Sequence, residues 1–488
     1  MIRRYRTLLH LGVVVALLGN LAMALPPARA QSSPASLRLF AADPTIKLFR
    51  YGRAVPLDLG VYATPVGGDF QLRVWREDYD TPVQIAQIDA ATGAVARSIS
   101  PETLAGWNGL ARFLDVTFTD AAGETIRTRH LTFCPNGWDR QRVDDHGSEI
   151  TRYPFNCGSY FPFVRGMVWG IEGGWATNAL SPSFEGEFGM PVVRVPAGTY
   201  TVAISIAPAY QELFGVTAAD GTVELEVNVI QAERRRWHHL HQRTVTSHDP
   251  SSGEGVPDVT DPDPSTLPDL VALPAWGMNA FHRRDKDLLG FASTLWNAGP
   301  APFVVEGFRR SGEDTMDAFQ YFYDGTEAVG RAPIGTMDYD ERRGHNHWHF
   351  EQFASFSLLD SSKTNVIKSK KQSFCIVPTD AVDLAVPGAV WNPYQTGIGT
   401  VCGGPRAIWV RETLEPGWGD TYYQQVAGQS FNITNVPNGW YYVEVRVNTN
   451  SAIVQTTTEN DVEHRLIHLG GRPGARRVMM TPWHGIPD

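Results

Sequence analysis

The stretches of this chain that can form regular structure are short runs in which apolar and polar residues alternate. Residues 199–206 (TYTVAISI) follow a Pro-Ala-Gly turn, and residues 222–230 (TVELEVNVI) alternate in the same way. Residues 440–447 (WYYVEVRV) follow a Pro-Asn-Gly turn. Because successive side chains of a strand point to opposite faces, each run predicts a strand with one buried face. Similar short runs predict strands at residues 37–39, 47–50, 70–75 and 114–118.

Turn-then-strand spacing without long helical periodicity predicts a mainly β fold of antiparallel sandwich domains. Residues 247–266 are rich in Pro, Ser and Asp, which predicts an extended linker. The linker separates a β-rich region at 31–246, of one or two sandwich-like modules, from a C-terminal domain at 267–470 and a tail at 471–488. The function of region 31–246 is not indicated. Its tryptophans are expected in a core rather than at a carbohydrate-binding surface: Trp107, Trp138, Trp169 and Trp175.

The first 30 residues have the pattern of a secretory signal peptide. Arg3, Arg4 and Arg6 precede a largely apolar stretch at residues 8–25, and Ala28-Arg29-Ala30 places small residues at the expected cleavage site. An uncleaved N-terminal anchor is the alternative. No second apolar stretch is long enough to span a bilayer. We therefore expect a secreted, extracellular protein without a membrane span after cleavage.

Cysteine usage and charge fit an exported protein. Proximity along the chain predicts two disulfides, Cys134–Cys157 and Cys375–Cys402, among the four cysteines. Loss of the signal peptide removes four of the 42 basic residues and none of the 52 acidic ones, which leaves a net charge of −14. This balance argues against nucleic acid as a partner and favours basic or amine-bearing ones, although solubility explains it equally well.

Three of the 14 histidines, His345, His347 and His349, lie at alternate positions within five residues. On a strand they share one face, and three imidazoles on one face suit copper, zinc or iron. The outer two would be about 13 Å apart on a regular strand, so we expect a twist or bulge to draw the rings together. A second group, His238, His239 and His241, is flanked by arginines and is expected to be solvated.

Other short motifs accompany the histidines in a fixed order. LPDL at residues 267–270 comes first, HxHxH follows at 345–349, and KxSFC and GDTY occupy 371–375 and 419–422. In this order and spacing they resemble the catalytic domain of the lysyl oxidase family, the copper-dependent protein-lysine 6-oxidases. The resemblance covers about residues 267–470 and implies a lysyl-oxidase-like β-sandwich for that domain. Nothing in the N-terminal region contributes to it.

The resemblance implies roles for particular residues. His345, His347 and His349 match the copper ligands, and Lys371 and Tyr422 match the pair that crosslinks into lysine tyrosylquinone. The family uses that cofactor with molecular oxygen to convert peptidyl lysine or another primary amine to an aldehyde, releasing ammonia and hydrogen peroxide. Taken alone, Lys371 belongs to a lysine cluster typical of a solvated face, and Tyr423 beside Tyr422 leaves the assignment open by one residue.

Asp269, Glu459 and Asp461 match acidic positions that bind calcium in the animal enzymes, although a polar loop explains them nearly as well. The chain departs from the animal pattern in having only two cysteines in this domain. Ser355 occupies the neighbourhood of an animal histidine, so no general base is assigned. These departures point to a divergent, microbial member.

Two other classes of function remain open from the sequence. One is a non-catalytic extracellular module that has the same fold and binds metal but never forms the quinone. The other is a different metalloenzyme, such as a zinc hydrolase or a cupin-like oxygenase, in which His345, His347 and Glu351 would be ligands.

Overall fold

The computed structural model describes residues 34–482 apart from 138, 144–147, 149, 159–160, 181–190, 233–255, 310–314, 341–346, 369–372, 401, 405–406, 408 and 427. Several predictions from the sequence lie outside the described residues. They concern the signal peptide, the first part of the linker and the end of the tail. They also concern six single residues: Trp138, His238, His239, His241, His345 and Lys371.

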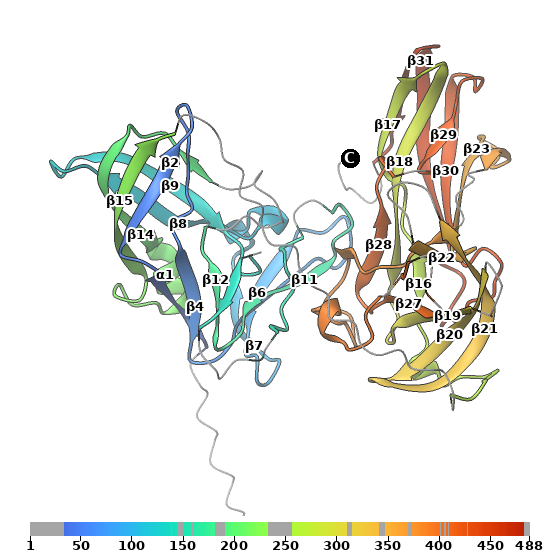
Figure 1. Cartoon of the computed structure of the whole chain (residues 1–488), viewed down its shortest axis with the longest axis horizontal. Helices are drawn as coiled ribbons and strands as arrows, with labels where there is room; N and C mark the ends of the chain where they lie inside the picture. The colour runs from blue at the N-terminus through green and yellow to red at the C-terminus, as the bar shows by residue number, and fades with distance from the viewer. Residues whose placement is uncertain are drawn as a thin grey trace, which may run out of the picture. The chain divides into compact units, whose positions relative to one another are not determined.

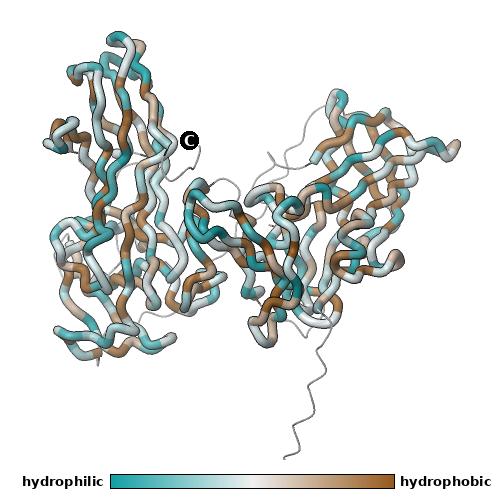
Figure 2. The backbone as a smooth tube through the Cα atoms, turned by 180° about the vertical axis from the view of Figure 1, so that it is seen from behind, coloured by the Kyte–Doolittle hydropathy of each residue, from teal (hydrophilic) through white to brown (hydrophobic). Residues whose placement is uncertain are grey.

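The described residues are mainly β, as predicted, with one short α-helix (Figure 1). Hydrophobic and hydrophilic positions alternate along many of the strands (Figure 2), which is the pattern of a sheet with one buried face. The helix α1 (Pro208–Phe214) begins with proline in its first turn and ends at Gly215, which is left-handed at φ 66°. Its Tyr210 and Phe214, one turn apart, are buried. No helix among the described residues is long and apolar enough to cross a membrane.

The described residues of the N-terminal region form three larger sheets and one two-stranded ribbon. The ribbon pairs β13 (Val192–Val193) with β3 (Val55–Pro56). The first sheet has the spatial order β1 (Ser36–Ala41), β4 (Val61–Val66), β12 (Trp175–Asn178) and β10 (Arg140–Arg142). The second has the order β11 (Gly166–Ile171), β5 (Phe70–Trp75), β6 (Gln84–Ile88) and β7 (Val95–Ile99). The third has the order β2 (Thr45–Arg50), β15 (Thr222–Gln231), β14 (Gly198–Ile206), β8 (Leu110–Thr119) and β9 (Thr125–Phe133).

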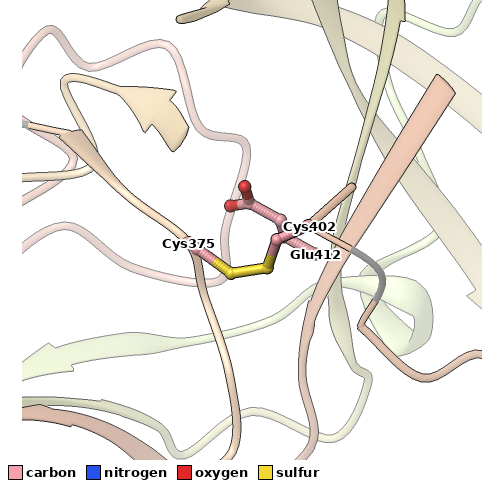
Figure 3. A group of neighbouring side chains, drawn as sticks. All are labelled: Cys375, Cys402 and Glu412. Carbon is pink, nitrogen blue, oxygen red and sulfur yellow. A yellow bond between two sulfur atoms is a disulfide. The ribbon is translucent and has the colours of Figure 1, made fainter. Parts of the chain in front are cut away.

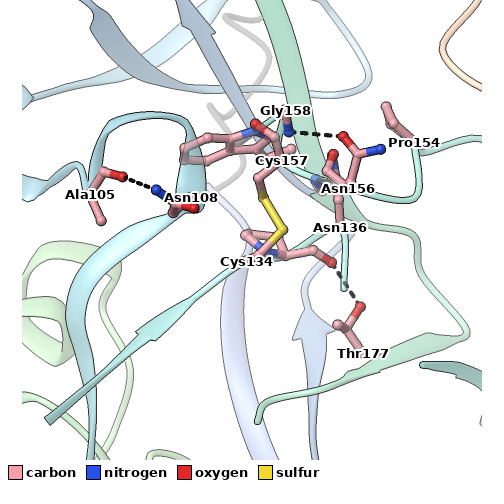
Figure 4. Close-up of a disulfide and its surroundings, with 12 residues drawn as sticks. Ala105, Asn108, Cys134, Asn136, Pro154, Asn156, Cys157, Gly158 and Thr177 are labelled. Carbon is pink, nitrogen blue, oxygen red and sulfur yellow. Dashed lines mark hydrogen bonds between the residues drawn. A yellow bond between two sulfur atoms is a disulfide. The ribbon is translucent and has the colours of Figure 1, made fainter. Parts of the chain in front are cut away.

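The predicted strands of this region are present, and the pairings are antiparallel with one difference. β2 and β15 run parallel, with Thr45 opposite Glu226, so the region is not purely antiparallel. The disulfide Cys134–Cys157 joins the expected pair of cysteines next to Asn136, which donates to the Asn156 carbonyl (Figure 4). Trp169 is fully buried in the core, and Trp107 and Trp175 are partly buried and pack against it.

The C-terminal part forms three further sheets. The first has the spatial order β16 (Leu270–Ala272), β18 (Lys286–Asn297), β28 (Trp418–Tyr422) and β26 (Asp380–Ala381), and β17 (Trp276–Arg283) and β29 (Ser430–Asn432) also pair with β18. The second has the order β25 (Ser373–Phe374), β22 (His347–Glu351), β21 (Glu327–Asp340), β20 (Thr315–Asp324), β19 (Phe303–Arg309) and β27 (Trp409–Leu414). The third has the order β24 (Asn365–Lys368), β23 (Ala354–Leu359), β30 (Gly439–Val447), β31 (Val462–Arg472) and β32 (Ala475–Met480).

The boundaries of this part differ from the predicted ones at both ends. β32 pairs with β31 along six residues, so the last sheet extends to Met480 rather than ending at residue 470. Residues 256–266, the second half of the predicted linker, are held in place as well. Asp258 forms a parallel bridge with Arg331 and accepts from its Nε at 2.8 Å. Short 3₁₀ turns complete the described elements: Pro101–Thr103, Gly106–Asn108, Pro264–Thr266 and Pro393–Gln395.

Candidate functional site

The histidine motif lies on β22, which is paired on both sides. Along β21 the register sets Asp340 opposite His347 and Asp338 opposite His349. On the other edge, Phe350 is opposite Phe374 of β25. Trp348 and Phe350 are each 1% exposed and face the hydrophobic core. By alternation, His347 and His349 therefore point to the opposite, polar face of the sheet.

The rings of His347 and His349 lie together on that face. Their centroids are 4.7 Å apart and their planes are at 86°. Metal–nitrogen bonds are about 2 Å long, so two imidazoles on one ion have ring centres about 4.5–5 Å apart at ordinary bond angles. The pair therefore fits the space that one metal ion requires. Asp340 Oδ2 is 3.6 Å from His349 Nδ1, where it can orient that ring.

Acidic and hydroxyl groups continue this polar face beside the histidines. Glu351 Oε2 accepts a hydrogen bond from Thr336 Oγ1 at 3.2 Å. Burial and the neighbouring Asp338 carboxyl raise the pKa of Glu351 above its usual 4.5. The surroundings of the two histidines therefore favour a cation over an anion.

The KxSFC and GDTY motifs meet at the next strand. The Tyr422 hydroxyl donates to the Cys375 carbonyl at 2.8 Å, and its ring packs edge-on against Phe374 with centroids 4.7 Å apart. Cys375 is bonded to Cys402, the pair expected from sequence proximity. Burial, followed by the carboxyls of Asp420 and Glu412, raises the pKa of Tyr422 well above its usual 10, so this phenol stays protonated near neutral pH.

Tyr423 is directed elsewhere. Its ring packs against Trp276 at a centroid distance of 5.7 Å. Of the two adjacent tyrosines, Tyr422 is therefore the one that contacts the KxSFC segment.

The structure brings the motif strands together without placing every ring on the same side. β22 carries His347 and His349, and it is hydrogen-bonded to β25, which contacts Tyr422. Phe374 shares the core face with Phe350, so Tyr422 packs on the face opposite the two histidine rings.

Glu412 is a residue of this neighbourhood that the sequence did not indicate. It is fully buried, and its Oε2 accepts from the Ile376 backbone N–H at 3.1 Å. Figure 3 shows its carboxyl group beside the Cys375–Cys402 disulfide. Among the described residues these three are the one set of metal-binding types with ligand atoms within 4.8 Å of one another. Because the sulfurs are bonded to each other rather than being thiolates, this set is not a metal site.

The cupin-like alternative has His345, His347 and Glu351 as ligands, and His345 lies outside the described residues. Of the other two, Glu351 accepts a hydrogen bond from Thr336 at 3.2 Å.

The acidic residues matched to calcium positions are brought together only in part. The Asn460 amide donates to Asp269 Oδ1 at 3.1 Å, and Gln455 Nε2 donates to Asp461 Oδ1 at 2.6 Å. Burial raises the pKa of Asp461 to about 6, and the nearby Asp269 carboxyl adds to the rise. Glu459, by contrast, is exposed. Asp269 and Asp461 are thus neighbours. Asn460, which the sequence did not indicate, lies beside them, and its side-chain oxygen is a further potential cation ligand.

The fold and the site define a β-sandwich domain with a candidate metal centre at one sheet edge. Residues 319–475 match the sequence model of the lysyl oxidase family. Lysyl oxidase homolog 2 of Homo sapiens and that of Bos taurus are each 26% identical to the chain over 141 residues. Over this segment the chain is therefore similar to the lysyl oxidase family, at low sequence identity to the relatives named here.

The similarity covers a limited part of each protein. The matched segment is 29% of this chain and 16% of the length of each relative. A solved structure, dimeric latent PorU from Porphyromonas gingivalis, aligns with 92% of this chain and 33% of its own, at 9% identity and a TM-score of 0.10. A TM-score this low carries no argument about the fold.

Proposed function

We propose that this protein is a secreted copper- and quinone-dependent amine oxidase that converts primary amines to aldehydes with release of ammonia and hydrogen peroxide. The observation that carries the proposal is the position of β25. This strand is hydrogen-bonded to β22, the strand that carries the histidines. Just after β25, the backbone carbonyl of Cys375 accepts a hydrogen bond from the Tyr422 hydroxyl. Three motifs that lie between residues 345 and 422 therefore meet at one sheet edge.

In this proposal His345, His347 and His349 hold copper, and Lys371 and Tyr422 form lysine tyrosylquinone. When formed, the quinone would supply an electrophilic carbonyl that unmodified protein side chains lack, with molecular oxygen as the co-substrate. The spacing of the His347 and His349 rings supports the copper assignment. The hydroxyl of Tyr422, held on the Cys375 carbonyl, supports the choice of this tyrosine over Tyr423.

The residues of the chain would bind and orient the reactants. Asp340 would orient the His349 ring, and the Asp338 and Glu351 carboxyls would accept hydrogen bonds from an ammonium group on the same polar face. Burial keeps the Tyr422 phenol protonated until it is oxidised. The disulfide Cys375–Cys402 fixes the segment that follows Lys371.

The remaining predictions from the sequence are part of the same proposal. The signal peptide at residues 1–30 would direct secretion, and residues 31–246 would form a separate β-rich region. Asp269 and Asp461 would hold calcium, with Glu459 recruited from the surface. Peptidyl lysine is the proposed substrate class, which fits the name of the relatives, and small primary amines are the alternative.

Amine-dependent peroxide release tests this function. Copper-loaded protein should release hydrogen peroxide when given a lysine-containing peptide or an alkylamine. Tyr422→Phe should reduce release to background, whereas Tyr423→Phe, the matched control, should keep most of it. Copper binding without amine-dependent peroxide, with no difference between the two variants, would indicate a non-catalytic metal-binding module instead.

A further inference from the structure

One peptide group, between Cys375 and Ile376, is held at both ends. Its carbonyl oxygen accepts from the Tyr422 hydroxyl at 2.8 Å. Its N–H donates to Glu412 Oε2 at 3.1 Å. The C=O and N–H of a trans peptide point in opposite directions, so Tyr422 and Glu412 lie on opposite sides of this group. The two side chains are connected through one planar unit.

Glu412 occupies a costly position for an acidic residue. It is 0% exposed, on a strand whose neighbours Val410 and Leu414 are core residues. Burial raises the pKa of this carboxyl well above its usual 4.5, which favours the neutral acid, and hydrogen bonds from the backbone of Ile376 and Phe350 oppose the rise. Burying a carboxyl destabilises a fold unless hydrogen bonds compensate, so the bond to Ile376 is important for keeping Glu412 at this position.

The hydrogen bonds on the two ends of a peptide group strengthen each other. Acceptance of the N–H by Glu412 shifts electron density onto the Cys375 carbonyl, which then binds the Tyr422 hydroxyl more strongly. The disulfide to Cys402 limits movement of the same segment. Glu412 thereby restricts where the Tyr422 hydroxyl can lie, although it is on a different strand, β27, and ten residues earlier in the sequence.

We propose that Glu412 is a positioning residue for Tyr422, acting through the Cys375–Ile376 peptide group. Its consequence for catalysis rests on the proposed function, because a fixed Tyr422 matters for activity only if the quinone forms. The positioning itself does not depend on that function. It is a property of the metal-free protein and is tested there.

The test is nitration of Tyr422 by tetranitromethane in metal-free protein, followed by mass spectrometry of the modified peptide. Glu412→Leu removes the acceptor at similar volume, and Glu412→Gln keeps an oxygen that can accept from Ile376. Both variants remove the ionisable group, so the comparison between them isolates the hydrogen bond. We expect Tyr422 to react about tenfold faster in the leucine variant and near the wild-type rate in the glutamine variant.

Two controls accompany the test. Tyr423 lies in the same peptide, and its nitration should be the same in all variants. Glu415→Gln changes another fully buried carboxyl, which is bonded to Thr396 and Thr413 and not to the Cys375 segment. It should leave Tyr422 reactivity unchanged. If Glu412→Leu does not fold, Glu412→Met removes the same acceptor with a more adaptable side chain.

Equal nitration of Tyr422 in the leucine and glutamine variants overturns the positioning role. A second arm measures phenylhydrazine labelling of copper-loaded protein. Labelling retained by Glu412→Gln and reduced by Glu412→Leu extends the positioning role to quinone formation. If the wild type takes up no label, the proposed function fails, but the nitration result still decides the role of Glu412.

Discussion

Tyr422 and Glu412 bind the two ends of one peptide group, the carbonyl of Cys375 and the N–H of Ile376. The tyrosine is on β28 and the glutamate on β27, whereas the peptide follows β25. Three strands of two sheets therefore determine where one phenol hydroxyl lies. The disulfide next to this peptide adds a covalent restraint, which leads to the first prediction.

Removal of the disulfide with the double change Cys375→Ser and Cys402→Ser should loosen the segment that holds Tyr422. The bond closes a loop over a sequence separation of 27 residues, and its loss should lower the free energy of unfolding by about 3–4 kcal/mol. Chemical denaturation measures this change. The equivalent change at Cys134 and Cys157 is the control. It should cost similar stability without raising the nitration of Tyr422.

Copper binding should depend on the paired histidines. His347→Ala should weaken copper affinity at least tenfold, because it removes one of two imidazoles with rings 4.7 Å apart. His468→Ala, a histidine on β31 that packs against Trp440, is the control and should leave the affinity unchanged. Calorimetric titration of copper provides the measurement. Equal affinity in the two variants would contradict the assignment of β22 as the metal strand.

Stability should fall as the pH rises because of Glu415. Burial raises the pKa of this carboxyl to about 8, whereas its value in the unfolded chain is about 4.5. The folded protein therefore holds a proton that the unfolded chain has lost. The stabilisation linked to this bound proton is complete below pH 4.5 and is lost progressively up to about pH 8. The free energy of unfolding falls by no more than about 1.4 kcal/mol per pH unit in this range.

Glu415→Gln should remove that component of the pH dependence. Urea unfolding of both proteins at several pH values between 5 and 8 measures it, and the wild type should show the steeper decline. Parallel curves for the two proteins would mean that Glu415 is already ionised in the native state.

The buried ion pair between Glu306 and Arg411 should be more sensitive to the loss of one partner than of both. Glu306 Oε1 accepts from Arg411 Nε at 2.9 Å, and its Oε2 accepts from Trp409 at 2.9 Å. Arg411→Met leaves a carboxylate with 0% exposure and should cost about 3–5 kcal/mol. The double change with Glu306→Leu should recover most of that loss in a denaturation experiment. No recovery would show that the charges are not coupled.

Alternation predicted much of the fold. Strands β14, β15 and β30 each bury one face, so their period is visible in the sequence. The partners of strands are not visible in this way. β2 pairs in parallel with β15 from about 180 residues away, and nothing in either strand specifies that choice. Strands buried on both faces, such as β11, show no alternation of apolar and polar residues.

The candidate site, like the fold, was predicted only in part from the sequence. The order of motifs predicted that the histidine, cysteine and tyrosine segments belong together, and the pairing of β22 with β25 agrees with that expectation. Glu412 was not predictable, because an acidic residue in a strand is ordinarily taken as solvent-facing. Only the packing of β27 shows that its carboxyl is buried. The register between β21 and β22 was likewise not predictable; it sets Asp338 opposite His349, and the Asp340 carboxyl reaches His349 diagonally at 3.6 Å.

The most direct test of the proposed function is peptide mapping of copper-loaded protein after phenylhydrazine treatment. The account predicts a new visible absorbance and a single labelled species in which the Lys371 and Tyr422 peptides are joined. The label should be lost when either residue is changed. Copper-replete protein that yields two unmodified peptides and no label would contradict the quinone, and with it the assignment as an amine oxidase.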